Sequence, residues 1–423
     1  DNLQSACLTS KHFFFSLHTT VFVEFYKSFL THSFFSSLNI FSLMSTSSQQ
    51  TIVLKVGTYV LQQPNGKLDY NLIQELAKTI AELRQRGHEV LLVSSGAIGA
   101  GRERCTALPN PPKAATPGKG RKELGIQQML AAVGQVRLMQ IYSEFFQEHQ
   151  ILVAQVLVTR ADFAKRQSYL NIRNTVQQLL HFGILPIINE NDVVSTEELP
   201  FFGDNDQLAV SFAALAGASH LFFLTSAPGL LVREQQTDGS FEDAVLPKVK
   251  QVNQELLQHC QRPGTNVGRG GMESKVRAAG KSISFGINAY ITAGKEPNTV
   301  LKILDGAQVG THFVAHGAKL RGYRQWLAAG ALSQGELHVD SGAEQALRVH
   351  KKSLLLSGVC EVQGNFSAKD PVNIFNLQHE LIGVGLAAQS AQALRVLLQQ
   401  SEANGHTRAV IHRDDLFLAD GHL

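Results

Sequence analysis

A polar cluster at 202–208, with the sequence Phe-Gly-Asp-Asn-Asp-Gln-Leu, combines a turn with side chains that can bind a ligand. Gly203 permits a tight turn, the acidic and amide residues 204–206 follow at once, and the apolar stretch 208–215 predicts a helix. Two interpretations fit: an Asx-type turn that caps the helix, or a ligand site. A calcium loop is excluded because its alternating acids, central glycine and distant glutamate are missing.

Two lysines elsewhere in the chain lie beside glycine turns. Lys55 follows the apolar run 52–54 and precedes Gly57, and Lys275 follows the glycine-rich segment 268–271. A glycine-rich loop before a helix offers backbone N–H groups and a positive dipole to an anion. The second loop has the spacing of neither the common phosphate loop nor the dinucleotide fingerprint, so taken alone it is also consistent with a surface turn and a solvated lysine.

The predicted elements bring these groups to one edge of a sheet. Apolar, β-branched runs predict strands at 52–54, 90–93, 152–158, 184–188, 221–224 and 289–292. Helical periodicity lies between them, at 72–83, 126–141, 170–180 and 207–216. This alternation predicts an α/β domain with a mainly parallel open sheet. Ligands bind such sheets at the carboxyl ends of the strands, where the polar residues of this chain gather.

The groups at the strand ends predict phosphoryl transfer. Two cations that frame glycine-rich backbone suit a phosphoryl group, whose charge spreads over its equatorial oxygens in the transition state. An acid between the two lysines would hold them in position, and Asp206 is the candidate. No catalytic base is needed if the acceptor is already an anion such as a carboxylate. The prediction rests on Lys55, Ser95, Asp192, Asp204, Asn205, Asp206 and Lys275.

Composition and length are those of a globular protein of two or three domains with a sizeable core. The formal net charge of +3 is close to balanced, so it gives no general electrostatic argument for binding nucleic acid or an acidic membrane surface. The cysteines have no paired spacing, which argues against a zinc site or a disulfide framework. The expected location is the reducing cytoplasm. The cysteines are Cys7, Cys105, Cys260 and Cys360.

Residues 1–49 differ from the rest of the chain, because their first 43 positions are crowded with Phe and Ser. A membrane span is disfavoured, since charged or ionisable residues such as Glu24 and Lys27 interrupt every window of the required length. A signal peptide would have a cleaner apolar run and a small-residue cleavage site. We interpret the segment as an extension upstream of a true start at Met44, with a transit peptide as the second interpretation.

Two domains are predicted after this extension. The α/β pattern covers 50–315, a linker follows at 316–331, and a small β-rich module covers 332–418. The module is predicted from short strand-like pieces at 336–339, 359–362 and 372–375, separated by Gly and Asp turns. Within the first domain, the Pro-, Gly- and Lys-rich segment 104–123 is predicted as an exposed loop, and 233–242 is a polar excursion.

Five short motifs in a fixed order make the combination far more specific than any one of them. They are Lys55-Val56-Gly57-Thr58, Ser94-Ser95-Gly96-Ala97-Ile98, Asn189-Glu190-Asn191-Asp192, Gly203-Asp204-Asn205-Asp206 and Gly270-Gly271-Met272-Glu273-Ser274-Lys275. They resemble the glutamate 5-kinases, a group of the amino acid kinase family. The tail resembles a PUA domain through Asp340-Ser341-Gly342-Ala343, Ser353-Leu354-Leu355-Leu356-Ser357-Gly358-Val359 and Gly364-Asn365-Phe366. The resemblance implies a three-layer αβα sandwich followed by a β-rich PUA-like domain.

The resemblance also implies an activity and a set of site residues. The activity is ATP-dependent phosphorylation of the L-glutamate γ-carboxylate to γ-glutamyl phosphate, the first step of L-proline biosynthesis. Catalytic roles fall to Lys55, Lys275 and Asp206, and substrate contacts fall to Ser95, Asp192 and Asn205. The implied ATP contacts are Lys55, Thr225, Ser226, Arg269, Gly270, Gly271, Met272, Glu273, Ser274 and Lys275.

Cofactors and partners follow from the same resemblance. ATP and Mg²⁺ are implied, and no protein ligand for the metal is named because phosphate oxygens and water would hold most of its coordination shell. A homo-oligomer and feedback inhibition by L-proline are expected, and no membrane partner is. RNA binding through the PUA-like domain is an open possibility.

Three residues depart from the family pattern, and two alternative functions stay open. Tyr59 stands where a small residue is usual and predicts crowding near the phosphates, Ser226 replaces an Asp, and Arg269 replaces a small polar residue. One alternative is another family member, acting on acetylglutamate or carbamate. The other is an RNA-binding PUA protein with an inactive kinase domain, which the nearly balanced charge disfavours.

Overall fold

The computed structural model describes residues 49–112, 121–194, 205–235, 241–260, 271–316, 326–327, 333–400 and 409–418. The extension at 1–48 with Met44 and most of the linker 316–331 lie outside these residues. Asp204, Arg269 and Gly270 also lie outside them. The domain boundaries therefore stay a prediction.

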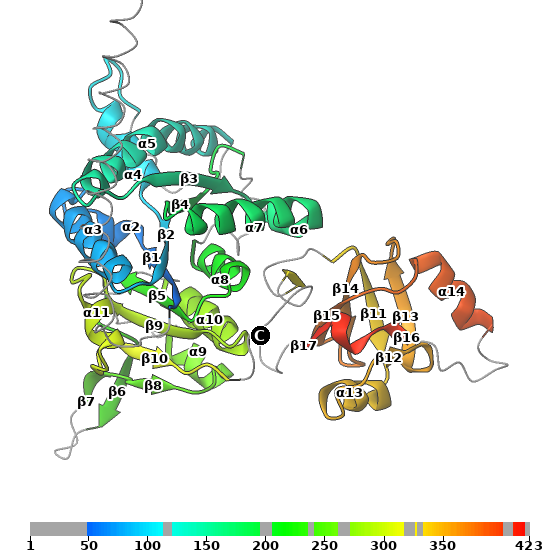
Figure 1. Cartoon of the computed structure of the whole chain (residues 1–423). Coiled ribbons are helices and arrows are strands. Elements are labelled where there is room, and N and C mark those ends of the chain that lie inside the picture. The colour runs from blue at the N-terminus through cyan, green and yellow to red at the C-terminus, as the bar shows by residue number, and fades with distance from the viewer. Residues whose placement is uncertain are drawn as a thin grey trace, which may run out of the picture. The chain divides into compact units, whose positions relative to one another are not determined.

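The first domain is built on an eight-stranded sheet with the strand order β3-β4-β2-β1-β5-β9-β10-β8 (Figure 1). Neighbouring strands are parallel except for β9 and β10, which are antiparallel. This confirms the predicted mainly parallel open sheet. The strands are β1 (Thr51–Val56), β2 (Glu89–Ser94), β3 (Val153–Val158), β4 (Leu185–Glu190), β5 (His220–Thr225), β8 (Lys248–Val249), β9 (Asn288–Ala293) and β10 (Thr311–Phe313).

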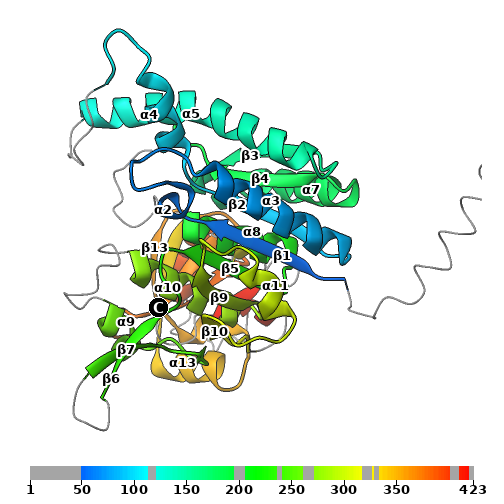
Figure 2. The same ribbon diagram turned by 90° about the vertical axis from the view of Figure 1, so that its left-hand side faces the viewer.

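Apolar side chains cover both faces of this sheet. In β1, Ile52 and Leu54 pack into one core cluster while Val53, between them, packs into the other. The alternation follows from the pleat, because successive side chains of a strand point to opposite faces. A parallel sheet buried on both faces needs helices on both, which confirms the predicted three-layer sandwich. Figure 2 shows the same layers after a quarter turn.

The helices divide between the two core clusters. One cluster takes its helical members from α2 (Thr58–Leu61), α3 (Tyr70–Gln85), α4 (Ala97–Cys105), α5 (Arg121–Gln147) and α11 (Thr299–Leu304). The other takes them from α6 (Arg160–Ala164), α7 (Arg166–His181), α8 (Asn205–Ala216), α9 (Gln254–Cys260) and α10 (Gly271–Ser284). The second group contains α8 and α10, whose first turns carry the candidate site.

Helices α4 and α5 meet backbone against backbone. A Cβ at Gly134 would lie 1.8 Å from the carbonyl oxygen of Ala97, and a Cβ at Gly101 would lie 1.9 Å from that of Leu130. Only glycine fits at either position, so the contact fixes α5 against the start of α4. The predicted loop at 104–123 is wrong at both ends, because α4 continues to Cys105 and α5 begins at Arg121.

Sequence periodicity also missed a β-hairpin at the polar excursion. Strands β6 (Leu231–Gln235) and β7 (Phe241–Val245) pair antiparallel, and they overlap the segment 233–242. Charged residues such as Arg233 and Asp243 stand opposite each other in the ladder. A two-stranded ribbon outside the main core needs little apolar alternation, so its sequence carries no strong strand pattern.

The C-terminal module is β-rich, as predicted. A five-stranded sheet has the order β13-β11-β14-β15-β17, and a core cluster of its own lies against it. Its strands are β11 (Gly335–Val339), β13 (Val359–Gly364), β14 (Pro371–Phe375), β15 (Leu381–Leu386) and β17 (Leu416–Leu418). The module also contains the strand pair β12 (Leu354–Leu355) and β16 (Ala409–Ile411), and the α-helices α13 (Ser341–Arg348) and α14 (Ala391–Gln400). Across the described part of the chain, no helix is long and apolar enough to cross a membrane.

Candidate active site

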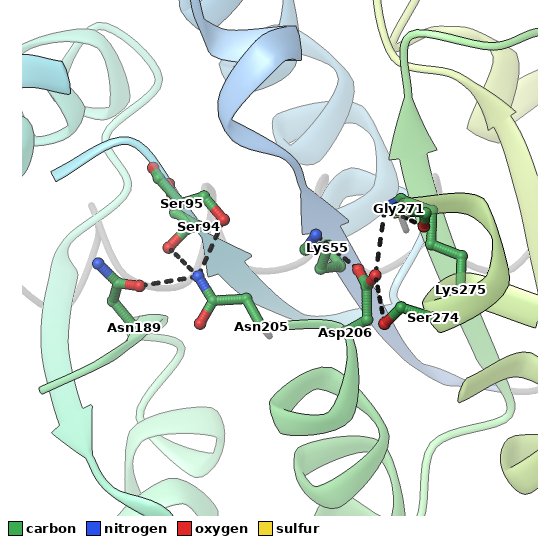
Figure 3. A network of polar contacts seen from close by, with 9 residues as sticks. All are labelled: Lys55, Ser94, Ser95, Asn189, Asn205, Asp206, Gly271, Ser274 and Lys275. Atoms are coloured by element: carbon green, nitrogen blue, oxygen red, sulfur yellow. Dashed lines mark hydrogen bonds and ion pairs between the residues drawn. The ribbon is translucent and has the colours of Figure 1, made fainter. Parts of the chain in front are cut away.

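Lys55 and Asp206 form a buried ion pair at the carboxyl end of β1. The Nζ atom of Lys55 lies 2.5 Å from Oδ1 of Asp206, and the two residues are 4 % and 0 % exposed (Figure 3). Asp206 is the second residue of α8, a helix that packs against β1. The strand and the helix therefore bring together two charged groups that are far apart in the sequence.

Lys275 reaches the same carboxylate from the opposite oxygen. Its Nζ lies 3.1 Å from Oδ2 of Asp206 and donates a second hydrogen bond, of 3.0 Å, to the carbonyl oxygen of Gly271 in the first turn of α10. Ser274 Oγ also approaches Oδ2, at 3.4 Å. The structure thus places Asp206 between the two lysines; the catalytic roles assigned to these three residues stay a prediction.

The electrostatics of this trio favour an ionised carboxylate. Burial by itself would raise the pKa of Asp206, but the charges of Lys55 and Lys275 and their hydrogen bonds outweigh it and hold that pKa below its usual range. One carboxylate neutralises one of two ammonium groups. The trio therefore carries one positive charge in excess at a buried position, which attracts an anion.

A glycine lies beside each of the two lysine head groups. A Cβ built on Gly57 would lie 3.9 Å from Nζ of Lys55, and one built on Gly271 would lie 3.9 Å from Nζ of Lys275. The backbone of Gly57 has φ −79° and ψ 157°, which any residue can adopt, so no turn geometry demands glycine there. The missing side chains instead leave room for a ligand beside each ammonium group.

Asn205, the neighbour of Asp206, turns its side chain toward a different set of partners. Its Nδ2 donates to Ser95 Oγ at 2.9 Å, to Asn189 Oδ1 at 3.0 Å and to the carbonyl oxygen of Ser94 at 3.4 Å (Figure 3). The first turn of α8 thus joins the lysine pair to the ends of β2 and β4. Ser95 follows β2 directly, and Gly96, with φ 103°, turns the chain into α4.

Sequence patterns did not single out two further polar residues of this network, Gln135 and Tyr142. Asn189 Nδ2 donates to Oε1 of Gln135 at 3.0 Å, and Ser94 Oγ and the hydroxyl of Tyr142 lie 2.7 Å apart. Gln135 and Tyr142 are both on α5 and are buried. Nothing in the local sequence marks them, because their partners Asn189 and Ser94 lie far away in the chain.

Asp192 follows β4 at the same edge of the sheet. Burial, with a smaller contribution from the charge of Glu190, raises the pKa of Asp192 to about 6. A carboxyl group held in this way gains from a cationic partner, which would favour its ionised form. The role of Asp192 as a substrate contact stays a prediction.

Four further predicted ATP contacts within the described residues differ in exposure. Thr225 ends β5 and is buried, and Ser226 after it is exposed. Met272 packs into the core, and Glu273 pairs with Arg277 at 2.8 Å, so their side chains are engaged within the protein. Tyr59, expected to crowd the phosphates, has a side chain that is 80 % exposed, in keeping with few contacts to the rest of the chain.

The chain matches two known protein families and is similar to known enzymes. Residues 50–293 match the amino acid kinase family, and residues 335–412 match the PUA domain. The chain is 39 % identical over 376 residues to the glutamate 5-kinase of Myxococcus xanthus, covering 87 % of this chain and 96 % of that one. It is 38 % identical over 375 residues to the glutamate 5-kinase of Syntrophus aciditrophicus, covering 86 % and 93 %.

Among solved structures, the chain is similar to a carbamate kinase from Giardia lamblia bound to AMP-PNP. The identity is 19 %, the TM-score is 0.45, and the match covers 64 % of this chain and 100 % of that one.

Proposed function

The chain belongs to the amino acid kinase family, in its glutamate 5-kinase group, and we propose that it phosphorylates the γ-carboxylate of L-glutamate with ATP. The product is γ-glutamyl phosphate, which makes this the first step of L-proline biosynthesis. The observation that carries the proposal is the buried carboxylate of Asp206 between Lys55 and Lys275, with one positive charge in excess. Such a site suits a group that gains negative charge during transfer.

The lysine pair supplies the stabilisation of the transition state. The two ammonium groups approach Asp206 from its two oxygens, and beside each of them a glycine leaves space for phosphate oxygens. Asp206 holds both lysines in place before ATP binds, so little reorganisation is needed during the reaction. The acceptor is a carboxylate that is already ionised at neutral pH, so no side chain has to remove a proton from it.

The Asn205 side of the site binds L-glutamate. The γ-carboxylate of the glutamate lies toward Asp206, where the phosphoryl group is transferred. The α-amino and α-carboxylate groups lie toward Ser95, Asn205 and Asp192. The α-ammonium group pairs with the carboxylate of Asp192, whose raised pKa returns toward its ordinary value when the cation binds.

Mg²⁺ enters this proposal as the partner of ATP. Both carboxylate oxygens of Asp206 contact lysines, and the described residues contain no group of three or more His, Cys, Asp or Glu side chains that could hold a metal ion. The Mg²⁺ ion would be bound mainly through phosphate oxygens and water. When bound, the ion would neutralise part of the phosphate charge.

An assay of ADP release with ATP and single acceptors tests the proposal. L-Glutamate is expected to support turnover, whereas acetylglutamate and carbamate are not. ADP release with acetylglutamate and none with glutamate would overturn the assignment in favour of another family member. Tight, salt-sensitive RNA binding without ATP turnover would favour the RNA-binding alternative.

The ADP-release assay with added L-proline tests the predicted feedback inhibition. The homo-oligomer, RNA binding by the PUA domain and the cytoplasmic location also remain proposals.

Gly57→Ala should lower kcat/KM for ATP by about tenfold or more while the protein stays folded. The new methyl group would occupy the space beside Nζ of Lys55, but its nearest neighbours would be at ordinary contact distances of 3.8 and 3.9 Å. Steady-state kinetics and thermal unfolding measure the two effects. Gly125→Ala is the matched control, because a Cβ there meets nothing within 4 Å. Equal kinetics for both variants would contradict the proposed phosphate position.

The KM for glutamate should rise as the pH falls below about 6, because protonated Asp192 no longer pairs with the α-ammonium group. The rise should approach about tenfold for each pH unit. In Asp192→Asn the KM should be high and independent of pH over the same range. A wild-type KM that stays flat between neutral pH and about pH 5 would contradict this role.

The raised pKa of Asp192 also predicts that Asp192→Asn increases the free energy of unfolding at neutral pH. Because the folded-state pKa is raised above the ordinary value of 3.8, the favourable contribution of Asp192 is present at low pH and lost as the pH rises through about 6. The variant should therefore unfold at a higher temperature than the wild type at neutral pH, and the difference should vanish near the ordinary pKa. Calorimetry at both pH values measures it.

A further inference from the structure

Two buried polar atoms of the amide cluster at the substrate end have no hydrogen-bond partner in the described residues. They are Nε2 of Gln135, a donor, and Oδ1 of Asn205, an acceptor. Gln135 is 9 % exposed and lies on α5, and Asn205 begins α8. Asn189 connects them, since its side chain accepts from Asn205 and donates to Gln135. Buried polar groups in folded proteins are nearly always paired, so an unpaired donor and acceptor in one cluster point to a ligand.

The backbone dictates which atom of each amide is left over. The N–H of Glu190 donates to Asn189 at 3.0 Å, so the atom that receives it must be Oδ1. Asn189 therefore donates from Nδ2 to Gln135, and the accepting atom of Gln135 must be its oxygen, Oε1. The spare atom of Gln135 must then be the Nε2 donor. This orientation follows from hydrogen bonding and does not depend on telling nitrogen from oxygen by position.

The same reasoning fixes Asn205. Its Nδ2 faces the carbonyl oxygen of Ser94 and Oδ1 of Asn189, both of which are acceptors. Flipping the amide would set its oxygen against two other oxygens. Its Oδ1 is therefore the spare acceptor of the cluster.

A donor and an acceptor match the two charged groups at the amino acid end of the substrate. We propose that Gln135 is a specificity-determining residue whose Nε2 donates to the α-carboxylate, while Oδ1 of Asn205 accepts from the α-ammonium group. This rests on the proposed function, which puts the γ-carboxylate at the Asp206 end. Asn205, Asn189 and Gln135 then lead away from Asp206 toward the amino acid end (Figure 3 shows the first two).

Gln135→Glu removes the donor and keeps an oxygen for Nδ2 of Asn189, but it also adds a negative charge where Nε2 was. The test compares kcat/KM of the full chain for L-glutamate and for L-isoglutamine, in which an amide replaces the α-carboxylate. The wild type should prefer glutamate. The variant should lower the ratio of the two values by about 10- to 100-fold, since a carboxylate repels the α-carboxylate and accepts from the α-amide.

Two further variants keep the result interpretable. Gln135→Met has nearly the same length and no donor, and it should also reduce the preference for glutamate. Asp192→Asn should raise KM for both substrates and leave their ratio unchanged, because both carry the α-ammonium group. Thermal unfolding checks that each variant is folded.

A role of Gln135 only in supporting Asn189 predicts a different pattern. Both substrates would then be affected alike in Gln135→Met, which adds no charge, and that result would overturn the proposal. An unchanged ratio in Gln135→Glu would overturn it as well. A wild-type chain that turns over neither substrate would instead refute the proposed function itself. The two failures are therefore distinct.

Discussion

Replacing either lysine of the site by alanine is expected to lower kcat by about 10²- to 10³-fold. Each ammonium group lies at one oxygen of Asp206, at 2.5 Å for Lys55 and 3.1 Å for Lys275, so neither can take the place of the other. The loss should fall on kcat more than on KM, because the charge that the lysines stabilise grows in the transition state. Initial rates at saturating ATP and glutamate measure it.

The two variants should differ in stability. The side chain of Lys55 is 5 % exposed, whereas that of Lys275 is 13 % exposed. Lys55→Ala should therefore cost more free energy of unfolding, because it removes the more buried partner of a buried carboxylate. Lys78→Ala is the control, since Lys78 also pairs with an acid, Glu75 at 2.7 Å, but is half exposed on α3. Near-normal kcat in either site variant would refute the two-lysine arrangement.

Asp206→Asn is expected to lower both activity and stability. The amide leaves two ammonium groups without their shared counterion at a position that is 0 % exposed. Removing one partner of a buried ion pair costs about 3–5 kcal/mol. Turnover should also fall by about 10²-fold or more, because the lysines lose the group that holds them in position. Chemical denaturation and initial rates measure the two effects separately.

The pH dependence of this stability loss has a fixed sign. The pKa of Asp206 is lowered in the folded protein, so its contribution is present above the ordinary value of 3.8 and lost as the pH falls through the lower, folded-state pKa. The gap in free energy of unfolding between wild type and Asp206→Asn should be full at neutral pH and shrink in acid.

Asp69→Asn is a matched control for this effect. Asp69 pairs with Lys295 at 2.9 Å, but it lies nearer the surface and an asparagine can still cap α3. Loss of the ion pair in Asp69→Asn should change the free energy of unfolding by about 1 kcal/mol or less. An equal loss of free energy of unfolding in Asp206→Asn and Asp69→Asn would show that the burial of Asp206 does not increase its contribution to stability.

Local sequence patterns were sufficient for the main elements. Short apolar runs such as 52–54 and 90–93 are typical of strands buried on both faces of a sheet, and their β-branched residues favour strands. Glycines and polar residues directly after those runs then had to fall at the carboxyl edge. Periodicity was less informative where packing is unusual. Helices α4 and α5 extend into the segment 104–123, whose composition predicts a loop, and the β6–β7 ribbon forms without a regular apolar face.

The sequence by itself determined which chemical groups this protein has at the ends of its strands: two lysines beside glycines, and the acids and amides near α8. Only the tertiary structure decided which of these groups bond to one another. Asn205 and Asp206 are neighbours in the chain, yet one bonds to Ser95, 110 positions away, and the other to Lys275, 69 positions away. Gln135 reaches the site across 54 positions through Asn189. Such contacts depend on how strands and helices pack, which local periodicity does not encode.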